Sequence, residues 1–148
     1  MSENLLHVVP TDPFWRPSAD VADRAAAVVA RLVAADSVVT VEFHRAAAFI
    51  HSGSNLERVE CPHCGANLER WADLMPDDYD DGFDDLAVRL PCCGADTSLD
   101  TLRFDWPCAF GCIDIAARNP GRSWLTDDEL ATIADALGHR VRQVMQHI

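Results

Sequence analysis

Two pairs of cysteines, each followed by a glycine, carry the plainest chemistry in this 148-residue chain. The first pair lies in Cys61-Pro-His-Cys64-Gly65 and the second in Pro91-Cys92-Cys93-Gly94. Two thiolates separated by two residues can reach one tetrahedral zinc ion, and a following glycine lets the backbone turn toward the sulfurs. The 27 residues between the two pairs are long enough for a ribbon that brings the pairs face to face. We therefore predict one structural Zn²⁺ ion bound by Cys61, Cys64, Cys92 and Cys93.

The adjacent cysteines leave the fourth ligand open. Neighbouring residues of an extended strand point to opposite faces, so Cys92 and Cys93 can bind one ion only where the chain turns sharply. If one of them does not bind, the fourth ligand could be His51, His63, Cys108 or Cys112. Cys108 and Cys112 could also form a disulfide or a second metal pair, although their apolar neighbours favour a place in the core.

The cysteine pattern favours a structural metal over a catalytic or redox centre. Four thiolates close the coordination shell, whereas a catalytic zinc keeps one position open. The sequence contains no His-x-Glu, which the zinc deaminases require. Thioredoxin-like redox chemistry is a minor alternative, because its C-x-x-C opens a helix whereas Cys64 is followed by the turn residues Gly-Ala-Asn.

The patterns around these residues predict an α+β fold with a small antiparallel or mixed sheet and two helices on one face. We expect strands at 5–9, 37–43, 46–51, 85–90 and 98–104, and a helix that begins after Ser18 and ends near Ala35. A C-terminal helix begins at the capping box Thr126-x-x-Glu129, and Gly138 predicts a kink in it or a break into two helices. We expect one domain over residues 1–148, with a zinc-ribbon-like insertion at about 57–104.

The charge of the chain bears on its partners. The formal net charge is −12, and residues 66–102 contribute ten acidic residues against two arginines. Such a field repels phosphate backbones, which makes nucleic-acid binding unlikely and favours a basic protein partner. The acidic loop from Asp73 to Asp85 and the tryptophans Trp15 and Trp71 are candidate contact residues. A calcium loop at 77–88 fails, because Val88 stands where an EF-hand needs glutamate.

The chain resembles a group of uncharacterised actinobacterial zinc-ribbon-containing proteins. The shared pattern is CPxCG, an acidic stretch, PCCG, a W-P-x-x-F segment and an N-P before a C-terminal helix. Here these are residues 61–65, 91–94, 106–110 and 119–120. The zinc-ribbon resemblance covers residues 59–102 only, and it implies a fold element and no particular reaction.

These observations predict a zinc-stabilised, non-enzymatic binding protein, with an acidic immunity-type inhibitor of a basic partner as one specific form. The first alternative is a small enzyme with a pocket between sheet and helices. Its candidate residues are His44, His51 and Asp114, although the two histidines would point to opposite faces of one continuous strand. The second alternative is a zinc-ribbon nucleic-acid-binding or transcription-related protein, with a basic face built from Arg16, Arg24, Arg31 and Arg118.

The start of the chain and its hydropathy predict a cytoplasmic protein. No apolar run approaches the roughly 18 residues that a membrane-spanning helix needs. Residues 1–9 contain neither a basic start nor a long apolar segment, so we do not expect a secretory signal.

Overall fold

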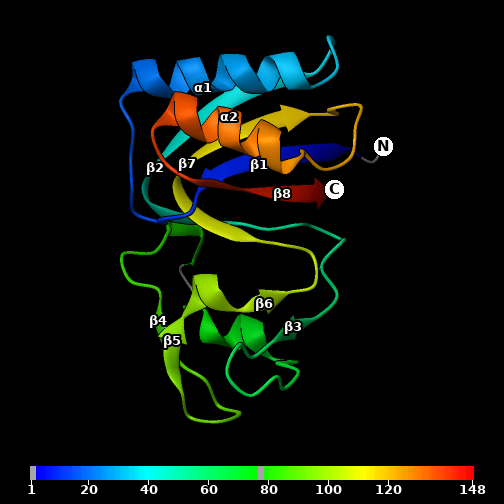
Figure 1. Cartoon of the computed structure of the whole chain (residues 1–148). Helices are drawn as coiled ribbons and strands as arrows, with labels where there is room; N and C mark the ends of the chain where they lie inside the picture. Colours follow the sequence, from blue (N-terminus) through cyan, green and yellow to red (C-terminus); the bar gives the residue numbers. More distant parts are fainter. Residues whose placement is uncertain (1–2, 77–78) are drawn as a thin grey trace.

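The computed structural model describes residues 3–76 and 79–148, and its main sheet has four strands in the order β2-β7-β1-β8. These strands are β1 (Asn4–Pro10), β2 (Val38–Ile50), β7 (Ala109–Arg118) and β8 (Val141–His147), and each neighbouring pair is antiparallel. Helix α1 (Ala19–Leu32) connects β1 to β2, and α2 (Asp127–Leu137) connects β7 to β8. The main sheet and its helices thus have the β-α-β-β-α-β arrangement of split βαβ, or ferredoxin-like, folds. The predicted α+β class, with two helices on one face, is confirmed (Figure 1).

The first core lies between the sheet and the two helices. Side chains alternate along a strand, so Leu6 and Val8 of β1 face the helices and His7 faces the other side. The buried apolar side chains of this core are Leu6, Val8, Ala22, Ala25, Val28, Val29, Ile113, Ile115, Ala117, Leu125, Ile133 and Leu137. Ser18 caps α1 as predicted, because its side chain accepts a hydrogen bond from the Val21 amide.

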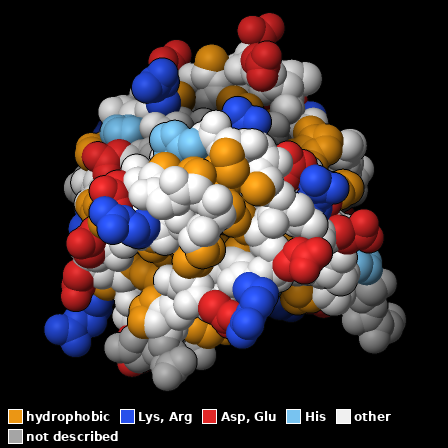
Figure 2. Space-filling model, turned by 90° about the horizontal axis from the view of Figure 1, so that it is seen from below, with side chains coloured by type: hydrophobic (Ala, Val, Ile, Leu, Met, Phe, Trp, Pro, Cys, Tyr) orange, Lys and Arg blue, Asp and Glu red, His pale blue; other side chains and the backbone are white. Residues whose placement is uncertain are grey.

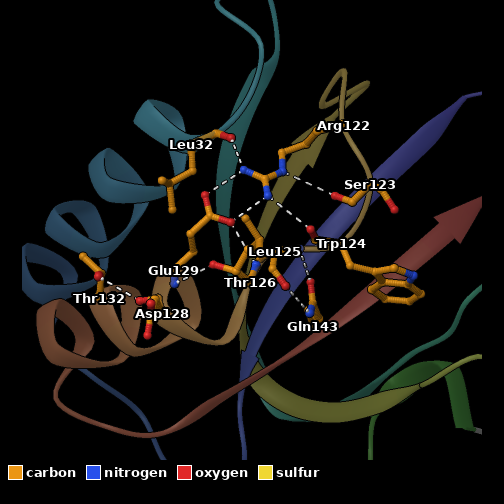
Figure 3. Close-up of polar contacts among 10 residues, drawn as sticks. All are labelled: Leu32, Arg122, Ser123, Trp124, Leu125, Thr126, Asp128, Glu129, Thr132 and Gln143. Atoms are coloured by element: carbon orange, nitrogen blue, oxygen red, sulfur yellow. Dashed lines mark hydrogen bonds and ion pairs between the residues drawn. The ribbon is translucent and has the colours of Figure 1, made fainter.

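The start of α2 is fixed by more than the predicted capping box (Figure 3). The Glu129 carboxylate accepts from the Thr126 amide at 2.8 Å, and the Thr126 hydroxyl accepts from the Glu129 amide at 3.2 Å. Arg122 donates to both carboxylate oxygens of Glu129, at 2.8 and 2.6 Å, and to the Leu32 carbonyl at 2.9 Å. The arginine therefore joins the beginning of α2 to the end of α1.

Two predictions for the main sheet are wrong. The strands expected at 37–43 and 46–51 form one strand, β2, whose register on β7 shifts between Phe43 and Ala48. The C-terminal helix ends at Leu137, where Gly138 adopts a left-handed conformation (φ 83°), and the chain continues as β8 instead of a second helix. The apolar residues after Gly138 fit helical spacing, but their pairing with β1 stabilises the extended form.

Residues 51–108 lie between β2 and β7 along the chain, on the side of the sheet away from the helices (Figure 1). We call these residues the inserted segment. Its elements are β3 (Val59–Glu60), the 3₁₀ turns η1 (Trp71–Leu74) and η2 (Tyr79–Asp81), β4 (Ala87–Arg89), β5 (Asp96–Ser98), η3 (Leu99–Thr101) and β6 (Arg103–Phe104). The strand expected at 98–104 is thus interrupted by η3. A second core of Leu68, Phe83, Leu86, Leu90, Leu99 and Leu102 packs on Phe110 of β7.

Within the part of the chain that the structure describes, neither helix has the length and apolar character needed to cross a membrane.

Candidate metal centre

The sulfur atoms of Cys61, Cys64, Cys92 and Cys93 lie within 4.8 Å of one another. The Cys61 and Cys93 sulfurs are 3.8 Å apart, and the Cys64 and Cys92 sulfurs are 3.5 Å apart. A tetrahedral zinc ion with bonds of about 2.3 Å to sulfur separates its ligand atoms by about 3.8 Å. The cluster is therefore close enough to hold one metal ion, and its size is compatible with zinc.

The first cysteine pair sits in a tight turn directly after β3. The Cys61 amide donates to the Ala66 carbonyl at 2.9 Å, and the Gly65 amide donates to the Cys61 carbonyl at 3.0 Å. The turn aims the amides of His63 and Cys64 at the Cys61 sulfur, at 3.3 and 3.4 Å. Gly65 closes the turn with φ 76°, a conformation that favours glycine.

The second pair sits in a turn of the same form between β4 and β5. The Leu90 amide donates to the Ala95 carbonyl at 2.9 Å, the Gly94 amide donates to the Leu90 carbonyl at 2.8 Å, and φ at Gly94 is 72°. This sharp turn removes the difficulty of adjacent cysteines, because both Cys92 and Cys93 reach the cluster.

Hydrogen bonds and the closeness of the four sulfurs shift the pKa values of the cysteine thiols. Burial raises the pKa of the Cys61 thiol, but the amides of Cys64 and His63 donate to its sulfur and, with the neighbouring thiols, lower the pKa to about 6. Desolvation, together with hydrogen bonds from the neighbouring thiols, raises the pKa of Cys92 to about 12. Four adjacent thiolates repel one another, and a cation among them relieves that repulsion and favours the deprotonated form. The donor set therefore fits a metal ion.

The other candidate ligands do not join this group of sulfur atoms. Among residues 3–76 and 79–148, the four cysteines are the one group of three or more potential ligands placed closely enough for a metal. Cys108 and Cys112 are buried and unbridged, as the prediction of a core position requires. The Cys108 sulfur lies 3.5 Å from the Ser52 hydroxyl.

A buried ion pair lies on the face of the sheet away from the helices, and the sequence did not predict it. His7 Nδ1 is 2.9 Å from both carboxylate oxygens of Asp114, and His7 Nε2 is 3.0 Å from Gln146 Oε1. Burial lowers the pKa of His7, but the hydrogen bond and charge of Asp114 more than offset this, so the pKa is raised. The alternation of side chains along a strand places His7 on the face opposite Leu6 and Val8. The register that brings His7 next to Asp114 could not be predicted from the sequence.

The prediction that His44 and His51 point to opposite faces is wrong. Five residue steps from Phe43 to Ala48 on β2 face only two steps on β7, and the extra residues reverse the alternation. As a result His44 and His51 line one hollow of about 180 Å³, together with His7 and Asp114. Burial and the charge of His7 lower the pKa of His51.

The remaining predicted contact residues are dispersed. Trp15 packs against the first core with its ring 4.6 Å from that of His139, and Trp71 packs against the second core. Of the arginines proposed for a basic face, Arg118 forms an ion pair with Glu3 and Arg16 donates to the His44 carbonyl. Within the acidic loop, Asp77 and Asp78 lie outside the described residues.

A scan against protein-family models finds no match to the chain, and comparisons with curated proteins and with solved structures find no similar protein. The resemblance to the actinobacterial group remains a prediction from the sequence pattern, whereas the clustered cysteines agree with a zinc-ribbon-like knuckle.

Proposed function

We propose that this chain is a non-enzymatic binding protein in which one zinc ion, held by Cys61, Cys64, Cys92 and Cys93, stabilises the inserted segment. The observation that carries the proposal is the convergence of four sulfurs, from two matching turns, within 4.8 Å. Four thiolates complete a tetrahedral shell and leave no position for water or substrate, which is the mark of a structural site. Zinc binding of this kind can supply on the order of 10 kcal/mol of folding free energy in small modules.

The charge of the inserted segment supports a basic protein as the partner. Residues 66–102 carry a formal charge of −8, two thirds of the total for the chain. The end of the molecule formed by the inserted segment displays acidic side chains, with basic side chains interspersed among them, around exposed apolar side chains (Figure 2). Acidic groups steer a cationic partner, and apolar groups supply contact area once it is bound. An immunity-type inhibitor that blocks a basic protein is the specific form that this surface favours.

Metal analysis tests the structural part of the proposal. Freshly purified protein should contain one zinc per chain, and Cys61→Ser, Cys92→Ser and Cys93→Ser should each lose it and melt at a lower temperature. Cys108→Ser is the matched control, because this buried cysteine lies outside the cluster. Preparations without metal would refute the proposal, and zinc that survives Cys93→Ser would indicate an open coordination position.

Peptide selection tests the partner. A random peptide library should yield binders rich in arginine and lysine on the zinc-loaded protein, and 0.5 M NaCl should weaken their binding because it screens charge. Neutralising Asp84 and Asp85, both exposed in the inserted segment, should weaken the same peptides. The matched control neutralises Asp127 and Asp128 on α2. Selected peptides without a cationic bias would contradict a basic partner.

A small enzyme is the second candidate, and the observation that favours it is the buried pair of His7 and Asp114 beside His51. The helix side of the sheet is filled by the first core, so such a site would lie on the opposite face. Turnover of chromogenic ester or phosphoester substrates that is lost in His51→Ala would support this candidate. Absence of turnover across both substrate classes would count against it.

A further inference from the structure

Two adjoining hollows lie where the inserted segment meets the sheet, and both are lined by Ala48, Phe49 and His51. The larger, of about 280 Å³, is completed by Trp71, Ala72, Met75 and Tyr79. The smaller, of about 180 Å³, is completed by His7, Glu42, His44, Ile50, Asp114 and Gln146. We call the two together the junction cleft. The larger hollow is its aromatic half, and the smaller hollow is its polar half.

The polar half has a fixed floor of hydrogen-bonded side chains. Both ring nitrogens of His7 lie within hydrogen-bond distance of oxygen atoms, one on Asp114 and one on Gln146, an arrangement that suits the protonated ring and agrees with the raised pKa of His7. The Gln146 amide nitrogen then lies 3.4 Å from His51 Nδ1. The Gly53 amide also donates to His51 Nδ1, at 3.0 Å, so the neutral His51 ring carries its proton on Nε2.

The charge of this half is negative. The His7 ring, when protonated, balances Asp114, with which it is paired. Glu42, by contrast, makes no ion pair with any described residue, and no described arginine lines either hollow. One uncompensated carboxylate therefore remains at the cleft, within a chain of formal charge −12.

The aromatic half provides ring surfaces, and it shares Phe49 with the hollow that Glu42 lines. Phe49 and Trp71 meet at 5.8 Å between ring centroids with an interplanar angle of 67°, and Tyr79, which also lines the larger hollow, is 43% exposed. Aromatic faces attract cations, and an arginine side chain gains more from them than a lysine does because its guanidinium is planar and weakly hydrated. A hollow of 280 Å³ lies just below the usual range for drug-sized ligands, which suits a single side chain.

We propose that the junction cleft receives one arginine side chain of the basic partner, with the guanidinium against Phe49, Trp71 and Tyr79 and its donors directed to Glu42. This inference rests on the proposed function and names the chemistry of the partner at one site. The forked donors of a guanidinium match a carboxylate with two parallel hydrogen bonds, which a lysine ammonium cannot form.

Titration with small probes tests the cleft without the partner. The indole N–H signal of Trp71, identified by its loss in Trp71→Phe, is followed by NMR while N-acetyl-arginine amide is added. The shift should saturate, should be weaker with N-acetyl-lysine amide, and should vanish with N-acetyl-citrulline amide, which has the same shape without the charge. Citrulline binding as strong as arginine binding would overturn the proposal.

Substitution of the carboxylate gives the second arm. Glu42→Gln should weaken the arginine probe about tenfold, because it removes a charged hydrogen-bond acceptor. Asp127→Asn on α2 is the matched control and should change nothing. Both variants alter exposed side chains, and matching thermal melts will show that the fold is retained. Unchanged affinity in Glu42→Gln would overturn the assigned role of Glu42.

The failure of this inference is distinguishable from failure of the proposed function. If cationic peptides bind the wild type and Glu42→Gln equally, the basic partner stands and the arginine site is refuted. If the arginine probe binds at Trp71 but no cationic peptide is selected, the cleft stands and the protein partner is refuted.

Discussion

Leu90 occupies, in the second cysteine turn, the position that Cys61 occupies in the first. The amide of each donates to a carbonyl five residues later at 2.9 Å, the carbonyl of each accepts from a glycine amide, and both side chains are fully buried. The turns read Cys-Pro-His-Cys-Gly-Ala and Leu-Pro-Cys-Cys-Gly-Ala, so Cys92 stands where the first turn has His63. Compared with the first turn, the second turn therefore carries one of its two cysteines two positions later.

This equivalence predicts that the displaced ligand can be moved back. Cys92→Ser should lose zinc, and the double variant Leu90→Cys with Cys92→Ser should regain one zinc per chain, because a cysteine at position 90 takes the place of Cys61 in the matching turn. Loss of the buried leucine methyl groups should cost about 2 kcal/mol of stability. Metal content and thermal melts of the two variants measure both effects.

The control for this rescue is Leu90→Ala with Cys92→Ser, which shortens the same side chain without adding a thiol. It should not bind zinc. If it did, or if the cysteine double variant remained free of metal, the two turns would not be equivalent.

The ion pair of His7 and Asp114 predicts a pH-dependent stability. The pKa of His7 is raised in the folded protein, so its stabilising effect is complete below the unfolded value of 6.5 and is lost as the pH rises through the folded value. Asp114→Asn should weaken this dependence and, because it removes the negative charge beside a buried histidine, cost on the order of 3 kcal/mol where His7 is protonated. Urea denaturation of both proteins between pH 5 and 9 measures the difference.

His139→Gln is the control for this pH effect, because His139 is only half-buried and, among the described residues, its ring hydrogen-bonds the neighbouring Arg140 carbonyl alone. The variant should keep the wild-type pH dependence. A wild-type stability that stays flat from pH 6 to 9 would contradict the raised pKa.

Local features of the fold and of the site could be predicted from the sequence. The cysteine turns depend on residues within six positions of each other, and the caps at Ser18 and Thr126 depend on residues within three. Short-range hydrogen bonding determines these features, so composition and spacing were sufficient. The convergence of the two turns followed from the limited ways in which a ribbon can close.

Features that depend on distant pairing could not be predicted. The segment that forms β8 has apolar residues at helical spacing, and only its pairing with β1, more than 130 residues away, makes it extended. The junction cleft likewise depends on the register shift in β2, which turns His44 and His51 to one side. Neither the shift nor the partner strand leaves a local signal.

Gly53 lies at a contact between the inserted segment and the C-terminal strand, β8. It forms a parallel bridge with His147, and a Cβ atom at this position would lie 2.2 Å from the His147 carbonyl oxygen. Its φ of 65° also disfavours other residues. Gly53→Ala should therefore cost more than the left-handed conformation alone, about 2 kcal/mol or above. Denaturant melts measure the loss.

Gly138→Ala separates the two contributions. Gly138 has a similar φ of 83°, but a Cβ atom there meets no described residue within 4 Å, so only the backbone cost of about 1 kcal/mol remains. Equal losses in the two variants would show that the His147 contact yields without cost.

The hydrogen bonds of Glu129 predict that the free energy of unfolding falls in acid. The hydrogen bonds from Arg122 and from the Thr126 amide lower the pKa of Glu129 to about 2, below the ordinary value of 4.5. Its stabilising effect is therefore complete above pH 4.5 and is lost as the pH falls through 2. At neutral pH, Glu129→Gln should be less stable than the wild type, since it loses the charge that both donors face, and the difference should shrink between pH 4.5 and 2.

Thr126→Ala and Asp135→Asn complete this test. The alanine variant removes the hydroxyl that caps α2 and should cost about 1 kcal/mol at every pH, because a hydroxyl does not titrate. Asp135 lies on the same helix without a hydrogen bond or ion pair from its side chain to another described residue, so neutralising it should leave the acid dependence unchanged. Urea melts of the three variants and the wild type from pH 2 to 7 distinguish the roles. A constant gap between Glu129→Gln and the wild type over this range would mean that Glu129 acts through packing, and that the low pKa is wrong.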